Sequence, residues 1–562
     1  MTAMNTDTSS STGSPNSSSN GSSKNAVGIK ETITSLIIAF MLAFLFRGFV
    51  IEGFQIPTGS MAPTLMGKHI RFVSPYSGYD WSVGPWTYAD RSRTRPVRQQ
   101  DDIKVNDPMS GLEMSDTNRR LAAGDRVFVL KYLPFLQSPK RWDVVVFKNP
   151  GTHENYIKRL VGMPGEQLAF VDGDVFARDF VEGTTATTGW DAWEESGWEV
   201  QRKSERVQRA MLQDVFNSRY VPAPAEPTYR SPFKGSSTGW DGVRSDSSYR
   251  YSGTGDTALA WNGTREITDA GSYNQTHGGY NLFKSSNSTS RSSFRPFPVS
   301  DVAVRLNIEA TDSAVDVSAV LSARGMEFRA VVGSATGNVG VEMRSVEGEA
   351  AAWESLDSGT IQAFEVGEIH SIEFWHIDQA LWLFVDDKLV CGGGEKGAYA
   401  MTPAQRAVAS TGTSWEALKS DNRSGDGADI RGVFSKTELY RKPTFRWDFS
   451  GGAFTLYNVS VQRDIAYQVS RRSPTRGGHP NFFPTLTDEE YFMCGDNSAN
   501  SLDSRLWAPG SIQKWIEAEI NDHVGTVHKD LVVGRAFLVY FPAPLDGGAV
   551  LTPDVGRMRW IW

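Results

Sequence analysis

Ser60 is the strongest candidate for a reactive side chain in this 562-residue chain. It lies in the stretch GFQIPTGSMAPTL, residues 53–65, directly after a glycine and between two prolines. A serine nucleophile needs a base within hydrogen-bonding reach and donors for the oxyanion that develops. The chain has eight histidines, but neither His69 nor His153 has an acidic partner at a recognisable spacing. Lysine is the other base that serves serine nucleophiles, so we look for a lysine.

Three motifs follow one another in a meaningful order: GFQIPTGSMAPTL at 53–65, YIKRLVGMPGE at 156–166 and GDNSANSLDSR at 495–505. Together they resemble the bacterial type I signal peptidases, membrane-bound Ser/Lys proteases that remove signal peptides from exported proteins. The resemblance covers an apolar anchor and roughly residues 48–72, 124–176 and 486–544. The middle of the chain lies outside it.

The resemblance implies a catalytic pair in which Ser60 is the nucleophile and Lys158 is the general base, with Ser501 orienting the lysine amine. A lysine with an ordinary pKa near 10.4 must be desolvated before it can act as a base at neutral pH. The apolar neighbours of Lys158 in the sequence suit that requirement. The implied oxyanion hole consists of the Ser60 backbone N–H and the Thr58 hydroxyl.

By the same resemblance, Asp496, Asn497, Asp503 and Arg505 of the third motif match the family's charged framework, and we expect an ion pair between Asp503 and Arg505 that supports the site. Many members read Gly-Asp-Asn-Arg-Asp-Asn-Ser, whereas this chain has Ser498 and Ala499 in place of the Arg-Asp pair, which puts one supporting ion pair in doubt. The resemblance also implies shallow apolar pockets for small substrate residues at positions −1 and −3. On sequence alone these pocket residues are equally well explained as core: Phe54, Ile56, Leu65, Tyr156 and Ile157.

The N-terminal region predicts a membrane anchor over residues 28–51. The run TITSLIIAFMLAFLF at 32–46 carries no charge, and with the residues that follow it reaches the length needed to cross a bilayer. A cleaved signal peptide and a buried core helix are the alternatives, but FRGFVIE after the run offers no small-residue cleavage site. We expect the Ser-, Thr-, Asn- and Gly-rich residues 1–26 to be a disordered tail.

The rest of the chain reads as mainly β. We expect a signal-peptidase-type catalytic β domain in two parts, 52–176 and 480–545, followed by a tail at 546–562. Between the parts lie an irregular linking insertion, 177–295, and a concanavalin- or laminin-G-like β-sandwich, 296–470. Alternating segments such as HSIEFWHIDQALWLFVDDKLV at 370–390 predict the sandwich. Trp375, Trp382 and the acids at 386–387 suggest sugar stacking and calcium, with core packing as the alternative.

A second insertion, 73–123, holds the stretches SPYSGYDW at 74–81 and DPMSGLEM at 107–114. They are similar to the paired Cys-Pro-x-Cys-Gly turns of a zinc ribbon in which every cysteine has been replaced. Our hypothesis is a relic ribbon that keeps its turns without the metal, because Ser and a single Asp are poor zinc ligands. The two cysteines, Cys391 and Cys494, are predicted to be buried apolar thiols.

These features predict a single-pass membrane signal peptidase I that cuts preproteins at small-x-small sites, with its catalytic domain on the periplasmic side of a bacterial inner membrane. We expect preproteins and membrane lipid as partners, a glycan or protein as a candidate ligand of the sandwich, and no metal or organic cofactor. The net charge of −8 argues against nucleic acid. The alternatives are a membrane-tethered carbohydrate-binding or scaffolding protein with an inactive peptidase domain, and a related Ser/Lys protease that cuts itself or a regulator.

Overall fold

A computed structural model of the chain divides into two compact units, residues 1–52 and residues 53–562. The structure describes residues 21–90, 93–96, 103–116, 121–131, 138–180, 189–222, 228–276, 296–346, 351–421, 432–470, 473–508, 510, 512–520, 523–547, 550–552 and 554–562. The predicted tail therefore lies largely outside the described residues, and a helix already begins at Gly21.

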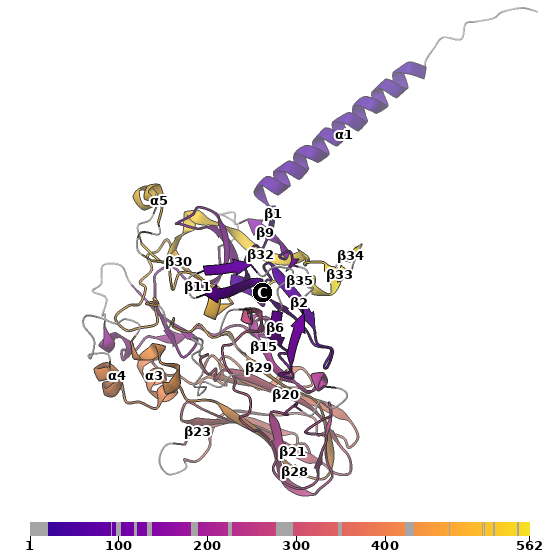
Figure 1. Ribbon diagram of the computed structural model, residues 1–562, viewed down its shortest axis with the longest axis vertical. Helices are drawn as coiled ribbons and strands as arrows, with labels where there is room; N and C mark the ends of the chain where they lie inside the picture. Colours follow the sequence, from indigo (N-terminus) through magenta and orange to yellow (C-terminus); the bar gives the residue numbers. More distant parts are fainter. Residues whose placement is uncertain are drawn as a thin grey trace, which may run out of the picture. The chain divides into compact units, whose positions relative to one another are not determined.

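The first unit is dominated by one helix, α1, Gly21–Phe49 (Figure 1). Its segment Gly28–Phe49 is 22 residues long and apolar enough to cross a membrane by length and composition. Large apolar side chains such as Ile33, Leu36 and Phe40 are more than half exposed. The predicted apolar helix is present, although a signal sequence near an N-terminus has the same length and composition.

The first motif begins on β1, the second begins on β11 and the third directly follows β30. These strands belong to one sheet with the order β1-β9-β32-β10-β11-β30-β31, to which β35 adds by pairing with β32. Strands β9 to β11 precede the large insertion and β30 to β32 follow it, so both parts of the predicted catalytic domain build the same sheet (Figure 1). The bounds are β1 Ile51–Gln55, β9 Arg126–Lys131, β10 Val144–Lys148, β11 Asn155–Gly162, β30 Glu490–Cys494, β31 Val527–His528, β32 Val532–Phe541 and β35 Arg559–Trp560.

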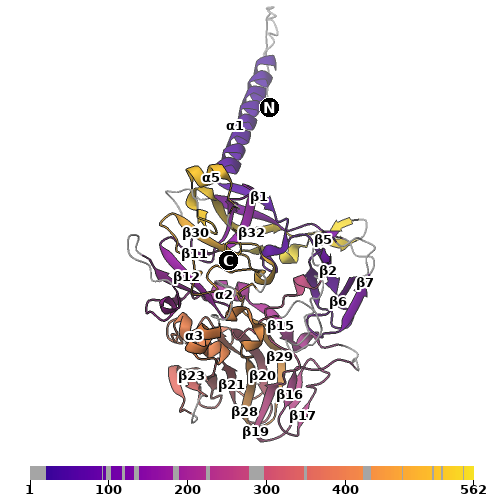
Figure 2. The same ribbon diagram turned by 60° about the vertical axis from the view of Figure 1, so that its left-hand side comes forward.

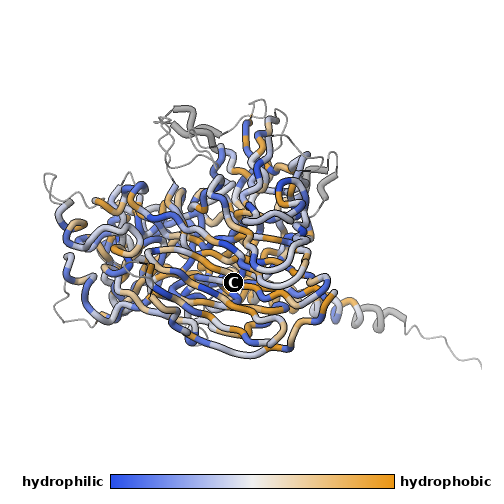
Figure 3. The backbone as a smooth tube through the Cα atoms, turned by 90° about the horizontal axis from the view of Figure 1, so that it is seen from below, coloured by the Kyte–Doolittle hydropathy of each residue, from blue (hydrophilic) through white to orange (hydrophobic). Residues whose placement is uncertain are grey.

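The large insertion folds into two antiparallel sheets with a shared apolar core, as a β-sandwich requires (Figure 2). One sheet has the order β17-β18-β29-β20-β25-β26-β27, with β15 also pairing with β29, and the other has the order β16-β19-β28-β21-β22-β23-β24. Hydrophobic and hydrophilic residues are interspersed along the chain (Figure 3). In β20 and β21, buried positions are interspersed with partly buried or exposed ones. The bounds are β15 Gln213–Asn217, β16 Phe233–Gly235, β17 Trp240–Asp241, β18 Tyr249–Tyr251, β19 Gly255–Trp261, β20 Val302–Ala310, β21 Val315–Ala323, β22 Met326–Val332, β23 Asn338–Ser345, β24 Glu354–Thr360, β25 Ile369–Ile377, β26 Ala380–Val385, β27 Lys388–Gly392, β28 Thr444–Gly451 and β29 Phe454–Arg463.

The sandwich starts earlier than the predicted bound of residue 296. Strands β15 to β19, between Gln213 and Trp261, lie in the segment that was expected to be irregular, yet they belong to the two sheets. These strands are short, and three of them, β15, β18 and β19, pair with β28 or β29, close to the other end of the insertion, while β16 pairs with β19 and β17 with β18. Their strand character depends on partners about 200 residues away, which local patterns do not reveal.

Smaller elements complete the second unit. A three-stranded sheet of β12 Glu166–Val171, β13 Asp174–Asp179 and β14 Glu199–Val200 continues from β11. Among the described residues, the α-helices outside the sheets are short: α2 Glu205–Met211, α3 Pro403–Thr411, α4 Trp415–Asp421 and α5 Lys514–Glu519. Cys391 and Cys494 are free and buried, as predicted.

The insertion at 73–123 contains two turns with matching hydrogen bonds. The Gly78 N–H donates to the Ser74 carbonyl at 2.9 Å, and the Gly111 N–H donates to the Asp107 carbonyl at 2.8 Å. The Ser77 hydroxyl joins the turns by donating to the Asp107 carboxylate at 2.6 Å. The paired turns expected from the sequence are thus present, held together by a side-chain hydrogen bond. The flanking strands are β2 His69–Val73, β3 Asp80–Val83, β4 Trp86–Asp90, β5 Arg93–Pro96, β6 Ile103–Asn106, β7 Glu113–Asp116 and β8 Leu121–Ala122.

Candidate active site

Ser60 and Lys158 meet although they are 98 positions apart in the sequence. Ser60 lies on a single 3-10 turn, η1, Gly59–Met61, which follows shortly after β1. Lys158 lies on β11, where it pairs in register with Val145 of β10. Its Nζ is hydrogen-bonded to Ser60 Oγ at 2.6 Å and to the Ile157 carbonyl oxygen at 3.1 Å. The sheet therefore fixes the amine, and the turn brings the hydroxyl to it.

The surroundings of Lys158 favour its neutral form. The residue is only 4% exposed, and burial lowers its pKa to about 8, against the opposing attraction of the Asp503 and Asp496 carboxylates. In the part of the chain that the structure describes, no carboxylate forms an ion pair with the Lys158 amine. An amine in this condition can accept a proton from the adjacent hydroxyl near neutral pH.

Ser501 lies in the site but does not contact the lysine through a recorded hydrogen bond. The residue is 3% exposed, and its Oγ has no hydrogen-bond partner among the described residues. It lies next to Gly495, where an added Cβ would approach Ser501 Oγ to 2.2 Å and the Ser60 carbonyl oxygen to 2.5 Å. Glycine is thus required at 495, and the orienting role of Ser501 stays a prediction.

A buried ion pair connects β11 to the third motif. Arg159 donates from Nε to Asp496 Oδ1 at 2.8 Å and from Nη2 to Oδ2 at 2.7 Å, and neither side chain is exposed. The Thr64 hydroxyl, from the segment after the nucleophile, donates to the same carboxylate at 2.5 Å. The sequence reasoning included Asp496 but missed Arg159 as its partner. The signal was available, because successive strand residues face opposite sides of a sheet and Arg159 directly follows Lys158.

The ion pair expected between Asp503 and Arg505 is present at 2.9 Å. The Asp503 carboxylate also accepts the Gly495 N–H at 2.9 Å. Arg505 Nη1 donates to the Ser498 hydroxyl at 2.8 Å. Ser498, which departs from the common family pattern, therefore serves this chain as an acceptor for the buried arginine.

Asn497 holds the nucleophile turn, a role that sequence reasoning did not assign. Its backbone N–H donates to the Ser60 carbonyl at 3.0 Å, and its side-chain Nδ2 donates to the Gly59 carbonyl at 3.0 Å. The asparagine stood in the quoted third motif, so its position was visible in the sequence while its partners were not.

Two donors stand free beside the nucleophile. Within the described ranges, neither the Ser60 backbone N–H nor the Thr58 hydroxyl has a hydrogen-bond partner, and Thr58 is exposed. Free donors are what an oxyanion hole needs before a substrate binds. This geometry is compatible with the predicted hole and leaves its role as a prediction.

The predicted pocket residues divide between two apolar clusters. Ile56, Leu65 and Ile157 lie in one cluster, with Phe54 packed against it. Tyr156 packs against the neighbouring cluster, and its ring centroid is 5.5 Å from Lys158 Nζ. Since Ile56 and Leu65 are almost fully buried, their positions suit both a pocket floor and a core residue.

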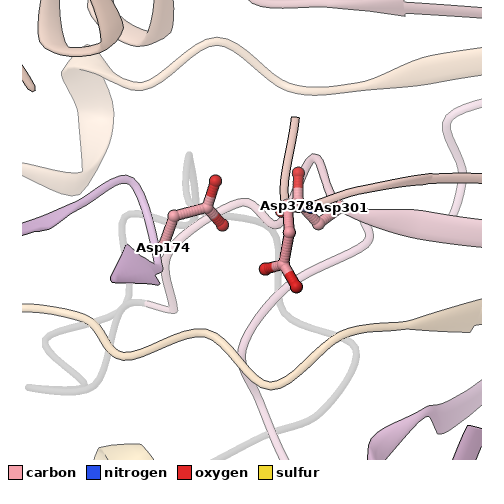
Figure 4. Close-up of side chains that lie close together, drawn as sticks. All are labelled: Asp174, Asp301 and Asp378. Atoms are coloured by element: carbon pink, nitrogen blue, oxygen red, sulfur yellow. The ribbon is translucent and has the colours of Figure 1, made fainter. Parts of the chain in front are cut away.

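A cluster of carboxylates at the junction between the β12–β13 hairpin and the sandwich is the candidate metal centre (Figure 4). One oxygen from each of Asp174, Asp301 and Asp378 lies within 4.8 Å of the others. Each carboxylate already has a cationic partner: Asp174 pairs with Arg406, Asp301 with Arg324 at 2.6 Å, and Asp378 with Lys203 at 2.7 Å. These arginine and lysine side chains already neutralise the carboxylates, as a bound metal ion would, so we assign no metal to this cluster.

The residues considered for sugar or calcium binding contact other side chains of the sandwich. Trp375 is fully buried and packs against Trp382, with ring centroids 5.7 Å apart. Asp386 contacts His370 at 2.9 Å, and the Asp387 carboxylate pairs with an arginine of β20 at 2.8 Å. The two tryptophans therefore pack as core residues, which was the alternative stated from the sequence.

A model of the signal peptidase family, peptidase S26, matches residues 29–186 and 451–541. The match is interrupted between these segments, where the sandwich strands are inserted. All three motifs lie in the matched segments. This division agrees with the sheet built from both parts of the chain.

Curated relatives are signal peptidases I. The one from Buchnera aphidicola subsp. Schizaphis graminum is 29% identical over 140 residues, which is 25% of this chain and 31% of the relative. The one from Rickettsia prowazekii is 26% identical over 152 residues, 27% of this chain and 44% of the relative. The chain thus spans about a third to less than half of the length of these relatives.

Solved structures give weaker likenesses. The carbohydrate binding module CBM66 from Bacillus subtilis has a TM-score of 0.21 and 10% identity, covering 42% of this chain and 96% of its own. Sheep galectin-11 has a TM-score of 0.17 and 14% identity, covering 30% of this chain and 98% of its own. At such low scores, neither says what the sandwich binds.

Proposed function

We propose that the protein is a serine endopeptidase of the signal peptidase family in which Ser60 and Lys158 form a catalytic dyad; the match of residues 29–186 and 451–541 to the peptidase S26 model supports this. The observation that carries the proposal is the 2.6 Å contact between Lys158 Nζ and Ser60 Oγ in a buried setting. The proposed substrates are exported preproteins, cut after small-x-small signal peptide ends.

The proposed reaction begins with a proton transfer. Neutral Lys158 accepts the Ser60 hydroxyl proton while Oγ attacks the carbonyl carbon of the scissile peptide bond. The lysine then gives this proton to the leaving amine, and an acyl-enzyme ester remains on Ser60. A water that loses its proton to Lys158 hydrolyses the ester and restores the serine. The lowered pKa of about 8 supports this cycle, because a fully charged ammonium accepts no proton.

The oxyanion of each tetrahedral intermediate would be stabilised by the Ser60 N–H and the Thr58 hydroxyl, which are free donors. The ion pairs Arg159–Asp496 and Asp503–Arg505 would hold β11 and the third motif in place around them. The cluster of Ile56, Leu65 and Ile157, with Phe54 and Tyr156 nearby, would form apolar walls that admit small side chains.

We further propose that α1 anchors the enzyme in a bacterial cytoplasmic membrane by a single pass, with the catalytic unit on the periplasmic side. The length, composition and exposure of Gly28–Phe49 support an anchor. An anchored enzyme meets its substrates at the membrane, where signal peptides are inserted.

The test is cleavage of a preprotein with an Ala-x-Ala site by the full-length protein in detergent or vesicles. Wild type should cut after the site, and Ser60→Ala and Lys158→Ala should each lose nearly all of this activity. Folding is checked by thermal unfolding of each variant. If folded wild type leaves several such substrates intact, the peptidase proposal is wrong and the binding or scaffolding alternative takes its place.

A further inference from the structure

Four consecutive polar residues of the insertion, Tyr273–Thr276, are buried. Tyr273 and Asn274 belong to the short 3-10 turn η4, Ser272–Asn274, and Gln275 and Thr276 follow it. None of the four is more than 9% exposed. Burying four polar side chains in a row is costly unless each one is hydrogen-bonded, so their partners are informative. We name residues 273–276 the clamp.

Asn274 of the clamp reaches the third catalytic motif. Its Nδ2 donates to Asn497 Oδ1 at 2.8 Å, and its Oδ1 accepts from Asn497 Nδ2 at 3.0 Å. This reciprocal pair fixes the amide plane of Asn497. The same Asn497 side chain donates to the Gly59 carbonyl, and the Asn497 backbone N–H donates to the Ser60 carbonyl. Asn497 therefore links Asn274 to the nucleophile turn.

Tyr273 packs directly on the nucleophile turn. An added Cβ on Gly59 would lie 2.0 Å from its ring, so only glycine fits beneath it. The Tyr273 hydroxyl donates to the Lys68 carbonyl at 2.6 Å, which fixes the ring in place. The requirement for glycine before the nucleophile is thus set in this chain by a side chain of the insertion.

The last two clamp residues bind the other insertion, 73–123. Gln275 accepts from the Asn106 N–H at 2.7 Å and donates to the Asn106 carbonyl at 2.9 Å, as a paired strand would. The Thr276 hydroxyl donates to the Gly84 carbonyl at 2.6 Å, and the Gly84 N–H donates to the Tyr273 carbonyl at 2.7 Å. The clamp thus connects the relic-ribbon region to the nucleophile turn.

We propose that Asn274 is a positioning residue for the Ser60–Lys158 pair. It orients the Asn497 side-chain amide, which holds the Gly59 carbonyl, while the Asn497 backbone N–H holds the Ser60 carbonyl. Together these bonds fix Ser60 Oγ against the lysine amine. The insertion is then part of the active site's support rather than a separate binding domain. The inference rests on the proposed function, because it assigns a purpose to the placement of Ser60.

The test compares full-length wild type, Asn274→Ala, Asn497→Ala and the double variant in cleavage of an Ala-x-Ala preprotein. We expect Asn274→Ala to lower kcat about 10- to 100-fold with KM nearly unchanged and Tm lowered by only a few degrees, because a small misplacement of the nucleophile slows the chemical step while the rest of the fold remains. Because Asn274 acts through Asn497, the double variant should have a kcat less than about twofold below that of Asn497→Ala alone. If the kcat losses of the two single variants multiply in the double variant, the two residues act independently and the proposal is overturned. Asn262→Ala is the matched control, since Asn262 hydrogen-bonds only within the insertion, to Ser231 and Thr264.

Hydrogen exchange separates this proposal from the peptidase proposal, because it needs no substrate. In Asn274→Ala, backbone amides in peptides covering 57–66 and 495–501 should exchange faster than in wild type, and those of the sandwich should not change. If wild type cleaves nothing but this local change is seen, the peptidase proposal falls and the positioning role stands. Unchanged exchange at both peptides overturns the positioning role, whatever the activity.

Discussion

The second unit holds two buried lysines in opposite settings. Lys158 on β11 contacts a serine hydroxyl at 2.6 Å, and burial lowers its pKa to about 8. Lys203, near the sandwich junction, contacts Asp378 at 2.7 Å and Asp464 at 2.9 Å. Burial also acts to lower the pKa of Lys203, but its two carboxylates outweigh that effect and raise it above the ordinary value.

The difference shows that burial alone does not make a lysine a base. What distinguishes Lys158 is that its carboxylate neighbours, Asp496 and Asp503, are each neutralised by an arginine at closer range. The two carboxylates still act to raise the pKa of Lys158, but Arg505 acts against them and burial outweighs their attraction. The partners decide which buried lysine is a candidate base and which is structural.

The largest expected effect is on Lys158. Lys158→Ala should lower kcat/KM by at least about 10³-fold, because proton transfer to and from Ser60 loses its base. Its Tm should stay near that of wild type, since the amine leaves no ion partner behind. Preprotein cleavage and thermal unfolding measure the two quantities. A variant that retains a tenth of wild-type activity would contradict the assigned role.

Lys203→Met should act in the opposite way. It leaves Asp378 and Asp464 buried without their cation, which should lower the free energy of unfolding by about 3–5 kcal/mol. Cleavage by the protein that remains folded should change by less than about threefold. Denaturant unfolding gives the free energy, and Lys442→Met is the control, because its pair with Glu266 is more exposed and should cost under about 1 kcal/mol. If Lys203→Met and Lys442→Met lowered the free energy of unfolding equally, the structural role assigned to Lys203 would be wrong.

The pH dependence of cleavage should report the pKa of Lys158. Only the neutral amine accepts a proton, so kcat/KM should rise about tenfold per pH unit below 8 and level off above it. A rate profile of the full-length enzyme between pH 6 and 9.5 measures this rise. A flat profile over that interval would mean that Lys158 does not titrate in the rate-determining step.

The smallest effect is expected at Ser498. Ser498→Ala removes one acceptor from Arg505, whose ion pair with Asp503 remains, so unfolding should become easier by about 1 kcal/mol. Cleavage should fall less than about threefold. Denaturant unfolding compares it with Ser473→Ala, a more exposed serine of the same segment. A loss as large as that of Lys203→Met would show that Ser498 stabilises the fold more than its hydrogen bonds to Arg505 and the Gln468 N–H suggest.

Sequence reasoning reached the parts of this molecule that are encoded locally. The strands around Lys158, the apolar helix and the Asp503–Arg505 pair were expected from short stretches, because alternation and motif spacing act over a few residues. The paired turns of the insertion 73–123 were likewise expected from two short repeats.

What the sequence did not reveal depends on long-range pairing. Strands β15, β18 and β19 pair with β28 or β29, about 200 residues or more away, so the local pattern of this segment was too weak to define the start of the sandwich. Asn274 reaches Asn497 across 223 positions, and a polar side chain has no periodic signal that announces a distant partner. Arg159 was visible beside Lys158, but only the folded sheet shows that it turns to Asp496.

The most direct test is to titrate Lys158 itself in the folded full-length protein. NMR of protein labelled at lysine side chains, with the resonance assigned by its loss in Lys158→Ala, follows the amine through pH without any substrate. We predict a titration midpoint near pH 8 for Lys158, while the Lys203 resonance stays in its charged form through that interval. A Lys158 midpoint above pH 10 would contradict the account, because its amine would then be charged when it is required to act as a base.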